Sequence, residues 1–325
     1  KDRGGYALSG HTDVVPVDGQ NWSSDPFRLR VENGRAYGRG SCDMKGFVAC
    51  CLAAVPVLIE QPLATPIHLA FSYDEEVGCT GVRPLLQKLA GRSEKPIGAF
   101  IGEPTGMQVV TGHKGKRSVK AVVRGATAHS SLAPTAVNSV HYASRLVARI
   151  DEIARRLQAT GPRDALYDIP HSTGHVGLLR GGEALNIVPD RAEMLFEFRT
   201  IAADDPDALV AEVRRHAEED LVPQMQAIEP ATGIDFDVFA GFPGLDTAAE
   251  APIVTFAKGL AGRNDHAKVA FGTEAGLFDA MAGIPSVVLG PGSITEAHKA
   301  DEFIEIDELA KCLAFIERLA ERCRA

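Results

Sequence analysis

The sequence predicts an α/β protein in which one domain interrupts another. Three observations support this prediction. Strands alternate with helices in the first third of the chain, the middle follows a β-α-β-β-α-β order, and the last segment returns to the first pattern. The 325 residues suffice for two domains of the usual ~100–200 residues. We therefore expect a discontinuous α/β domain at 1–113 and 243–325, interrupted by a ferredoxin-like domain at 114–242.

In the first α/β segment, short apolar runs predict strands and longer apolar patterns predict helices. We expect strands at 6–9, 35–38, 67–72 and 97–101, and helices at 45–60 and 81–90. Their alternation favours a largely parallel or mixed sheet. Because the first strand follows Lys1 so closely, we expect the chain to begin inside a domain.

The inserted domain is predicted from strands that alternate between apolar and polar side chains. This alternation is clear at 118–124 (SVKAVVR) and at 191–199 (RAEMLFEFR). The other elements expected there are a helix at 135–158, a strand at 175–179, a helix at 205–221 and a strand at 234–240. In the last segment, we expect a strand at 286–289 and a closing helix at 306–323.

Composition and charge argue against two kinds of partner. Hydrophobic residues make up 45% of the chain and charged residues 24%, as is typical of a folded globular protein. The formal net charge of −9 argues against nucleic acid and anionic membrane surfaces, because both attract basic proteins. The longest uncharged apolar stretch, 47–59, is shorter than the ~20 residues of a membrane span. We expect neither partner.

The cysteines indicate reduced thiols rather than a disulfide scaffold. They include no C-x-x-C pair, and two of them are adjacent, where a mutual disulfide would be strained. No signal peptide is visible, so we expect a cytoplasmic protein. We interpret the cysteines as small hydrophobes or loop residues and not as nucleophiles. They are Cys42, Cys50, Cys51, Cys79, Cys312 and Cys323.

Candidate metal ligands lie at or just beyond the ends of predicted strands, where open α/β sheets form their sites. They are His11, Asp43, Glu76, Glu103 and His298. Singly, each has an ordinary explanation: His11 as a surface histidine, Asp43 as a helix N-cap and Glu76 as a solvated acid. Together, two imidazoles and three carboxylates, one of them bridging, give three ligands to each of two metal ions. Mixed nitrogen and oxygen ligands suit Zn²⁺, with Co²⁺ or Mn²⁺ as alternatives.

Two further acids lie close to these ligands in the sequence. Asp13 can orient the imidazole of His11, as carboxylates do behind metal-bound histidines. Glu75 precedes Glu76, and adjacent side chains point in different directions, so Glu75 is free to move protons. Two metal ions about 3.5–4 Å apart can polarise a carbonyl and hold a hydroxide nucleophile. Glu75 would then take a proton from the water and return it to the leaving amine.

Six segments, taken in order over nearly the whole chain, resemble the M20 family of dinuclear zinc amidohydrolases. They are SGHTDVVPV, GRGSCDMKGF, SYDEEVGCTG, IGEPT, HKGK…GATAHSS and GPGSITEAHKADEF. A single segment such as DEE is a weak signal, whereas the ordered set is a strong one. Cys42, Cys79 and 271–276 (FGTEAG) resemble in particular the branch that deacetylates N²-acetyl-L-ornithine.

The resemblance implies a zinc-peptidase-like catalytic domain and a small lid domain that mediates homodimerisation. It places His11, Asp43 and Glu103 on one metal ion. It places Asp43, Glu76 and His298 on the other. Family members carry a helical segment and a strand ahead of SGHTD, so the resemblance also implies sequence before the start of this chain.

The resemblance also assigns roles in the reaction. It makes Asp13 the carboxylate beside His11, and Glu75 the general base and acid. It brings His129, in GATAHS, across to the partner subunit's active site, where the imidazole would stabilise the tetrahedral oxyanion. From the residues alone, His129 is more simply an exposed histidine at the end of a strand.

Five further residues are candidates for substrate binding. Asn186 and Arg199 match family positions that contact substrate. Arg199 can hold an amino-acid carboxylate through two hydrogen bonds, or it can form a salt bridge at the end of a strand. Gly290 and Gly292 can present backbone N–H groups to that carboxylate, although a plain turn is equally compatible with them. Glu274 can face the ammonium group of ornithine.

The expected reaction is hydrolysis of N²-acetyl-L-ornithine to acetate and L-ornithine, a step of arginine biosynthesis. Three alternatives keep the reaction class: deacylation of succinyl-diaminopimelate, deacylation of another N-acyl amino acid, and dipeptide hydrolysis. A fourth alternative is a catalytically silent scaffold that binds metal or dimerises. Relative kcat/KM values on a panel of acyl amino acids separate these possibilities.

Overall fold

The computed structural model describes residues 4–324, which divide into two compact units. Unit 1 comprises the described parts of Lys1–His113 and Phe242–Ala325, and unit 2 comprises Lys114–Gly241. Both units are built from sheets and helices, which confirms the predicted α/β fold class. Residues 1–3 and 325, which belong to the expected domain ranges, lie outside the described residues.

A mixed sheet forms the centre of unit 1. Its strands are β1 (Tyr6–His11), β4 (Ile67–Ser72), β5 (Gly98–Ile101), β6 (Val110–His113), β11 (Leu245–Asp246), β12 (Ala267–Val269) and β13 (Ser286–Val288). Their order is β11-β6-β13-β5-β1-β4, with β12 paired to β6. Strands β4, β1, β5 and β13 run parallel, so their carboxyl ends meet at one edge of the sheet.

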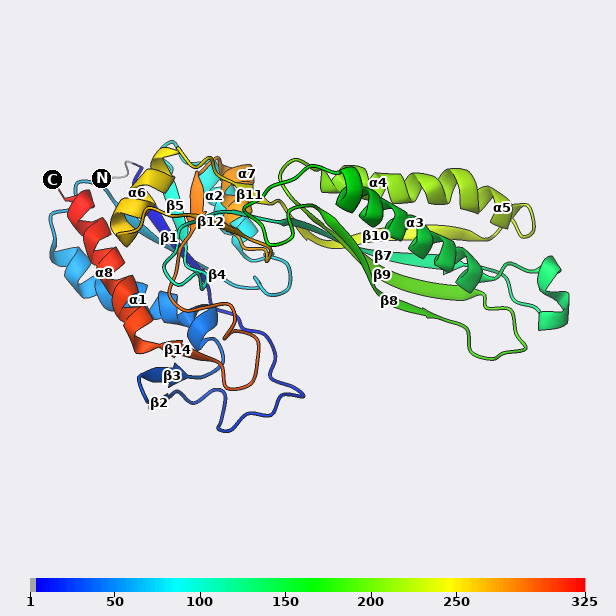
Figure 1. Ribbon diagram of the computed structural model, residues 1–325, viewed down its shortest axis with the longest axis horizontal. Helices are drawn as coiled ribbons and strands as arrows, with labels where there is room; N and C mark the ends of the chain where they lie inside the picture. The colour runs from blue at the N-terminus through cyan, green and yellow to red at the C-terminus, as the bar shows by residue number, and fades with distance from the viewer. Residues whose placement is uncertain (1–3, 325) are drawn as a thin grey trace. The chain divides into compact units, whose positions relative to one another are not determined.

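Helices cover both faces of this sheet (Figure 1). They are α1 (Gly46–Glu60), α6 (Pro252–Ala261) and α8 (Ile306–Cys323) on one face, and α2 (Val82–Ala90) and α7 (Ala275–Ala282) on the other. Leu8 and Phe100 point into the first core, whereas Ala7 and Ile101 point into the second. Because helices cover both faces, apolar side chains of these strands point to both sides of the sheet and not to one side alone.

A small sheet joins two segments that lie far apart in the sequence. It has the order β14-β3-β2 and contains β2 (Arg30–Glu32), β3 (Arg35–Tyr37) and β14 (Phe303–Glu305). Both pairings are antiparallel. Strand β3 leads into the turn that carries Asp43, and the loop that carries His298 leads into β14. The small sheet therefore brings these two loops together.

Ser41–Glu60, which contains α1, is long and apolar enough by length and composition to cross a membrane, with a mean hydropathy of 1.8. Half of the most apolar stretch is nevertheless buried inside the described structure. Phe47 and Cys51 are fully buried in the core shared with α8. A long apolar helix of this kind is equally typical of a protein core, and we interpret α1 as a core helix.

Unit 2 contains a sheet of strand order β10-β7-β9-β8. Its elements are, in chain order, β7 (Gly115–Arg124), α3 (Ser139–Thr160), β8 (Thr173–Gly181), β9 (Arg191–Thr200), α4 (Pro206–His216), the short α5 (Val222–Gln226) and β10 (Gly233–Phe242). Apart from α5, this is the β-α-β-β-α-β order of the sequence analysis. Alternate residues of β7 and β9, such as Val119 and Phe196, are buried with Leu146 of α3 and Val213 of α4.

Candidate metal centre

Two clusters of histidine and carboxylate side chains lie in unit 1 and share one residue, Asp43. The first cluster contains His11, Asp43 and Glu103. The second contains Asp43, Glu76 and His298. Within each cluster, the atoms that could bind a metal ion all lie within 4.8 Å of one another. The structure therefore brings together all five side chains that the sequence analysis proposed as ligands.

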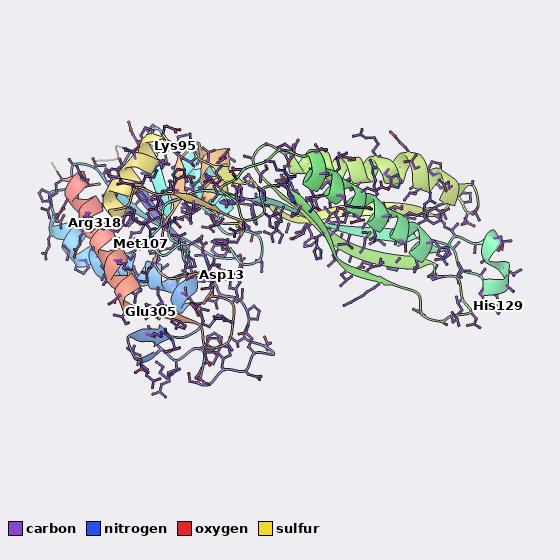
Figure 2. The ribbon with its side chains drawn as sticks, in the orientation of Figure 1. Asp13, Lys95, Met107, His129, Glu305 and Arg318 are labelled. Atoms are coloured by element: carbon purple, nitrogen blue, oxygen red, sulfur yellow. The ribbon has the colours of Figure 1, made fainter. Side chains whose placement is uncertain are left out.

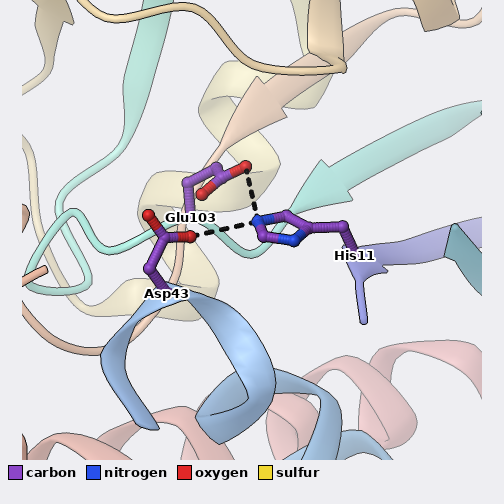
Figure 3. Close-up of side chains that lie close together, drawn as sticks. All are labelled: His11, Asp43 and Glu103. Carbon is purple, nitrogen blue, oxygen red and sulfur yellow. Dashed lines mark hydrogen bonds and ion pairs between the residues drawn. The ribbon is translucent and has the colours of Figure 1, made fainter. Parts of the chain in front are cut away.

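The first cluster is built at the ends of neighbouring parallel strands. His11 is the last residue of β1, and Glu103 follows β5 by two residues. Nε2 of His11 lies 3.0 Å from Oδ1 of Asp43 and 3.8 Å from Oε1 of Glu103 (Figure 3). All three residues are buried. Their polar atoms face one another and not solvent, which is an arrangement that can enclose a cation.

The second cluster uses the other carboxylate oxygen of Asp43. Nε2 of His298 lies 3.0 Å from Oδ2 of Asp43 and 3.2 Å from Oε1 of Glu76. The side chain of His298 is 47% exposed, so this cluster opens toward solvent. Because Oδ1 of Asp43 faces His11 and Oδ2 faces His298, this carboxylate is placed to bridge two ions.

Asp13 orients the imidazole of His11. Nδ1 of His11 lies 3.0 Å from the backbone carbonyl oxygen of Asp13, which can only accept, so Nδ1 carries a proton and Nε2 faces the cluster. The backbone N–H of Glu76 donates to Oδ2 of Asp13 at 3.1 Å. Burial alone would raise the pKa of Asp13, but the hydrogen bonds from His11 and from the backbone outweigh this effect and lower the pKa to about 2. Asp13 is therefore ionised at neutral pH.

Two further carboxyl groups, Glu75 and Glu274, interact with the clusters. Burial of its carboxyl group raises the pKa of Glu75 to about 8, and the negative charges of Glu76 and Glu274 add to this rise. Sγ of Cys79 lies 3.3 Å from Oε1 of Glu75. Burial likewise raises the pKa of Glu274 to about 7. Glu75 can thus take up and release a proton near neutral pH, as a general acid–base requires.

The donor set of the two clusters fits divalent cations. Hydrogen bonds to Asp43 and Glu76 raise the pKa of His298 to about 10. Burial alone would lower the pKa of His11, but the larger effect of its carboxylate partners raises the pKa well above the ordinary range. Burial and the charge of Asp43 raise the pKa of Glu103. Protons on these groups offset the repulsion between the clustered carboxylates, and bound cations would do the same. The mixed nitrogen and oxygen donors suit zinc.

We expect the affinity for Zn²⁺ to rise with pH between about pH 6 and 8, because metal and protons compete for the same nitrogens. The pKa of His298 is raised to about 10, so below that pH its protonated form dominates and a proton must leave for the metal to bind. Calorimetric zinc titration in buffers of different protonation enthalpy measures this release. Affinity that is independent of pH, without proton release, would contradict the assignment of His298 as a ligand.

The backbone N–H groups of Gly290 and Gly292, proposed as donors to a substrate carboxylate, have partners within the chain. The N–H of Gly290 donates to Oγ1 of Thr105, and that of Gly292 donates to Oε2 of Glu308, each at 3.2 Å. A Cβ at Gly290 would lie 2.0 Å from the carbonyl oxygen of Gly102. Glycine at position 290 therefore permits a close approach of two backbone segments.

The remaining candidates lie in unit 2, at two ends of its sheet. His129 lies in the loop beyond one end (Figure 2), where the N–H of Ser130 donates to the carbonyl of Asn186 at 2.9 Å. His129 and Asn186 are therefore neighbours. Arg199 lies near the other end of β9, where its Nε donates to Oε1 of Glu197 at 2.9 Å. Arg199 thus forms the strand-end salt bridge that was its alternative interpretation.

Three side chains lie beside this site in positions that the sequence did not indicate: Arg39, Cys79 and Glu302. All three lie inside the segments GRGSCDMKGF, SYDEEVGCTG and EAHKADEF. Their closeness in sequence to the candidate ligands was the one signal that could have marked these charged and thiol side chains as part of the site. Nothing in the sequence shows that Arg39 and Glu302 pair with each other across 263 positions.

Two adjoining clusters that share a carboxylate, at the carboxyl edge of an α/β sheet and beside a protonatable acid, define a metal-dependent hydrolase. Residues 7–322 match the sequence model of Peptidase family M20/M25/M40. The chain belongs to this family, as the resemblance indicated, and it is a metallohydrolase that acts on amide bonds.

Two curated relatives share about a third of their residues with the chain. Acetylornithine deacetylase of Myxococcus xanthus is 34% identical over 316 residues, which are 97% of this chain and 79% of the relative. Acetylornithine deacetylase of Proteus mirabilis (strain HI4320) is 32% identical over 318 residues, which are 98% of this chain and 77% of the relative.

Solved structures share the fold at lower identity. An M20 family metallo-carboxypeptidase from Sulfolobus solfataricus has a TM-score of 0.74 at 22% identity, with 98% of this chain and 84% of that chain covered. Aminopeptidase PepT from Bacillus cereus has a TM-score of 0.72 at 23% identity, with 99% and 81% covered.

Proposed function

We propose that this protein hydrolyses N²-acetyl-L-ornithine to acetate and L-ornithine, as a step of arginine biosynthesis. The observation that carries the proposal is the pair of clusters that share Asp43, with Glu75 beside them. The similarity to acetylornithine deacetylases over nearly the whole chain supports this substrate. Other acyl amino acids and dipeptides are the alternatives that the substrate panel below tests.

The proposed cofactors are two divalent metal ions, zinc or cobalt. His11, Asp43 and Glu103 would hold one ion. Asp43, Glu76 and His298 would hold the other. Such ions supply Lewis acidity, which polarises an amide carbonyl and makes water a better nucleophile at neutral pH.

Glu75 is the proposed general base and acid. It would take the proton of the attacking water and pass it to the nitrogen of the departing ornithine, which must be protonated to leave. The carboxyl group suits this task because it is desolvated and its pKa is raised toward neutrality. Asp13 would keep Nε2 of His11 directed at the cluster by fixing the other ring nitrogen.

Three residues are proposed to recognise the substrate. Oε1 of Glu274 is buried and has no hydrogen-bond partner among the described residues, so it can accept from the ammonium group of ornithine. Arg199 would bind the substrate carboxylate, and Asn186 would contact the substrate, as the family resemblance implies. To bind the substrate carboxylate, Arg199 would have to leave its salt bridge with Glu197 or to contact both carboxylates at once.

A cytoplasmic homodimer that associates through unit 2 is also proposed. The loops of unit 2 expose large apolar side chains next to His129, and such patches are typical of interfaces. These side chains are Leu132, Leu185 and Ile187. Within the dimer, His129 would enter the partner subunit's active site and donate to the developing oxyanion. The buried cysteines are all free, which agrees with a reducing compartment.

A substrate panel tests the proposed reaction. We expect the zinc-loaded protein to show a kcat/KM for N²-acetyl-L-ornithine at least ~10-fold above those for succinyl-diaminopimelate, N-acetylmethionine and a dipeptide. Released amine is the measured product. A higher value for another member of the panel would reassign the substrate. A folded, metal-loaded protein that turns over no member would support the silent scaffold instead.

A further inference from the structure

A buried ion pair lies next to the metal clusters and takes no part in the proposed reaction. Nη1 of Arg39 lies 2.6 Å from Oε2 of Glu302, and each side chain is 1% exposed. Arg39 follows β3 and Glu302 precedes β14, so the pair connects the loops on two neighbouring strands of the small sheet. Burying two charges is costly even when they are paired, and such a pair therefore asks for an explanation beyond stability.

The second oxygen of Glu302 holds the backbone of the bridging residue. Oε1 of Glu302 accepts from the N–H of Cys42 at 2.9 Å and from the N–H of Asp43 at 3.1 Å. Hydrogen bonds to an ionised, buried acceptor are stronger than those between neutral groups. They fix the turn from which the Asp43 side chain projects, and so they help to direct its two oxygens at the two clusters.

The other side of Arg39 reaches the loop of His298. Arg39 donates to Oε1 of Gln20, whose Nε2 in turn donates to the carbonyl oxygen of His298 at 3.1 Å. Nη1 of Arg39 also donates to the carbonyl oxygen of Lys299 at 3.4 Å, and the guanidinium lies over the ring of Trp22. His298 has a φ of 62°, a left-handed conformation that a histidine adopts only when its surroundings hold it.

We propose that Arg39 and Glu302 are positioning residues for the metal centre. Glu302 sets Asp43 through the backbone, and Arg39 sets His298 through Gln20. The inference rests on the proposed function, because it requires metal ions in both clusters. It separates two effects: loss of Glu302 disturbs the ligand that both clusters share, whereas loss of Gln20 disturbs the second cluster alone.

Zinc titration against a chelating dye tests this, with Glu302→Gln and Gln20→Ala compared with the wild type. We expect Glu302→Gln to weaken both zinc ions, by about 10- to 100-fold, and Gln20→Ala to weaken one of them. Because Glu302 does not touch substrate, kcat should fall more than KM rises. Glu305→Gln is the matched control: Glu305 pairs with Arg35 at 2.8 Å in the same small sheet and should leave both zinc affinities unchanged.

Circular dichroism establishes that each variant is folded before the titration. Wild-type affinity for both ions in folded Glu302→Gln would overturn the role of Glu302, and the same result in Gln20→Ala would overturn the link to His298. If Glu302→Gln does not fold, Gln20→Ala, which removes a partly exposed side chain, decides the proposal alone. A wild-type protein that binds no zinc would overturn the proposed function and not merely this inference.

Discussion

Replacement of Glu75 by glutamine should lower kcat on N²-acetyl-L-ornithine by about 100- to 10,000-fold, the usual contribution of a general acid–base. Glutamine keeps the size of the side chain but cannot accept or return a proton. Because Glu75 belongs to neither cluster of candidate ligands, the variant should still bind two zinc ions. Turnover and zinc stoichiometry, measured on the same preparation, therefore separate proton transfer from metal binding.

Asp74→Asn is the matched control for this experiment. Asp74 belongs to the same run of acids but is exposed, and its φ of 54° is one that asparagine adopts readily. It should retain wild-type turnover. Unchanged turnover in Glu75→Gln would remove Glu75 from its role, and loss of zinc from that variant would make it a ligand or a structural residue instead.

Replacement of His129 by alanine should lower kcat by about 100- to 1,000-fold, the usual cost of losing one oxyanion donor. The proposed dimer gives this variant a second test. A heterodimer of His129→Ala and Glu75→Gln subunits has one site with both defects and one site with neither. Random exchange of subunits should therefore restore about one quarter of wild-type activity from two inactive parents. Activity against mixing time, with sedimentation of the dimer, measures this recovery.

His141→Ala is the matched control in the same unit, because His141 is exposed on α3 and belongs to no candidate site. It should keep wild-type turnover. If two inactive dimers exchange subunits and activity does not return, His129 acts within its own subunit. If His129→Ala is fully active, it has no role in the reaction.

The candidate ligands were readable from the sequence because their positions follow from local pattern. His11 and Glu103 close predicted strands of one parallel sheet, and parallel strands bring their carboxyl ends together wherever they lie in the chain. The bonds of Gly290 and Gly292 were not readable. Their partners, Thr105 and Glu308, are set by how distant loops pack, on which composition and spacing carry no information.

Boundaries of elements shifted where side chains compete for the backbone. The helix predicted at 135–158 begins later, at Ser139, because the Asn138 side chain accepts from two backbone N–H groups and caps it there. Ser130–Thr135 forms a separate 3₁₀ turn. The three-residue strands β2 and β12 were not predicted, because so short a run shows no period, whereas β3 and β13, equally short, were.

The position of β13 has a consequence for biosynthesis. This strand lies between β5 and β6, although both precede it in the chain and all of unit 2 is translated in between. Before β13 is synthesised, the nascent chain already contains four of the five candidate ligands, but its sheet lacks the strand between β5 and β6. Unit 2, which is continuous in sequence, can reach its final pairing while the ribosome still holds that gap open. The candidate metal centre therefore cannot be complete before β13 and the loop that carries His298 have been synthesised.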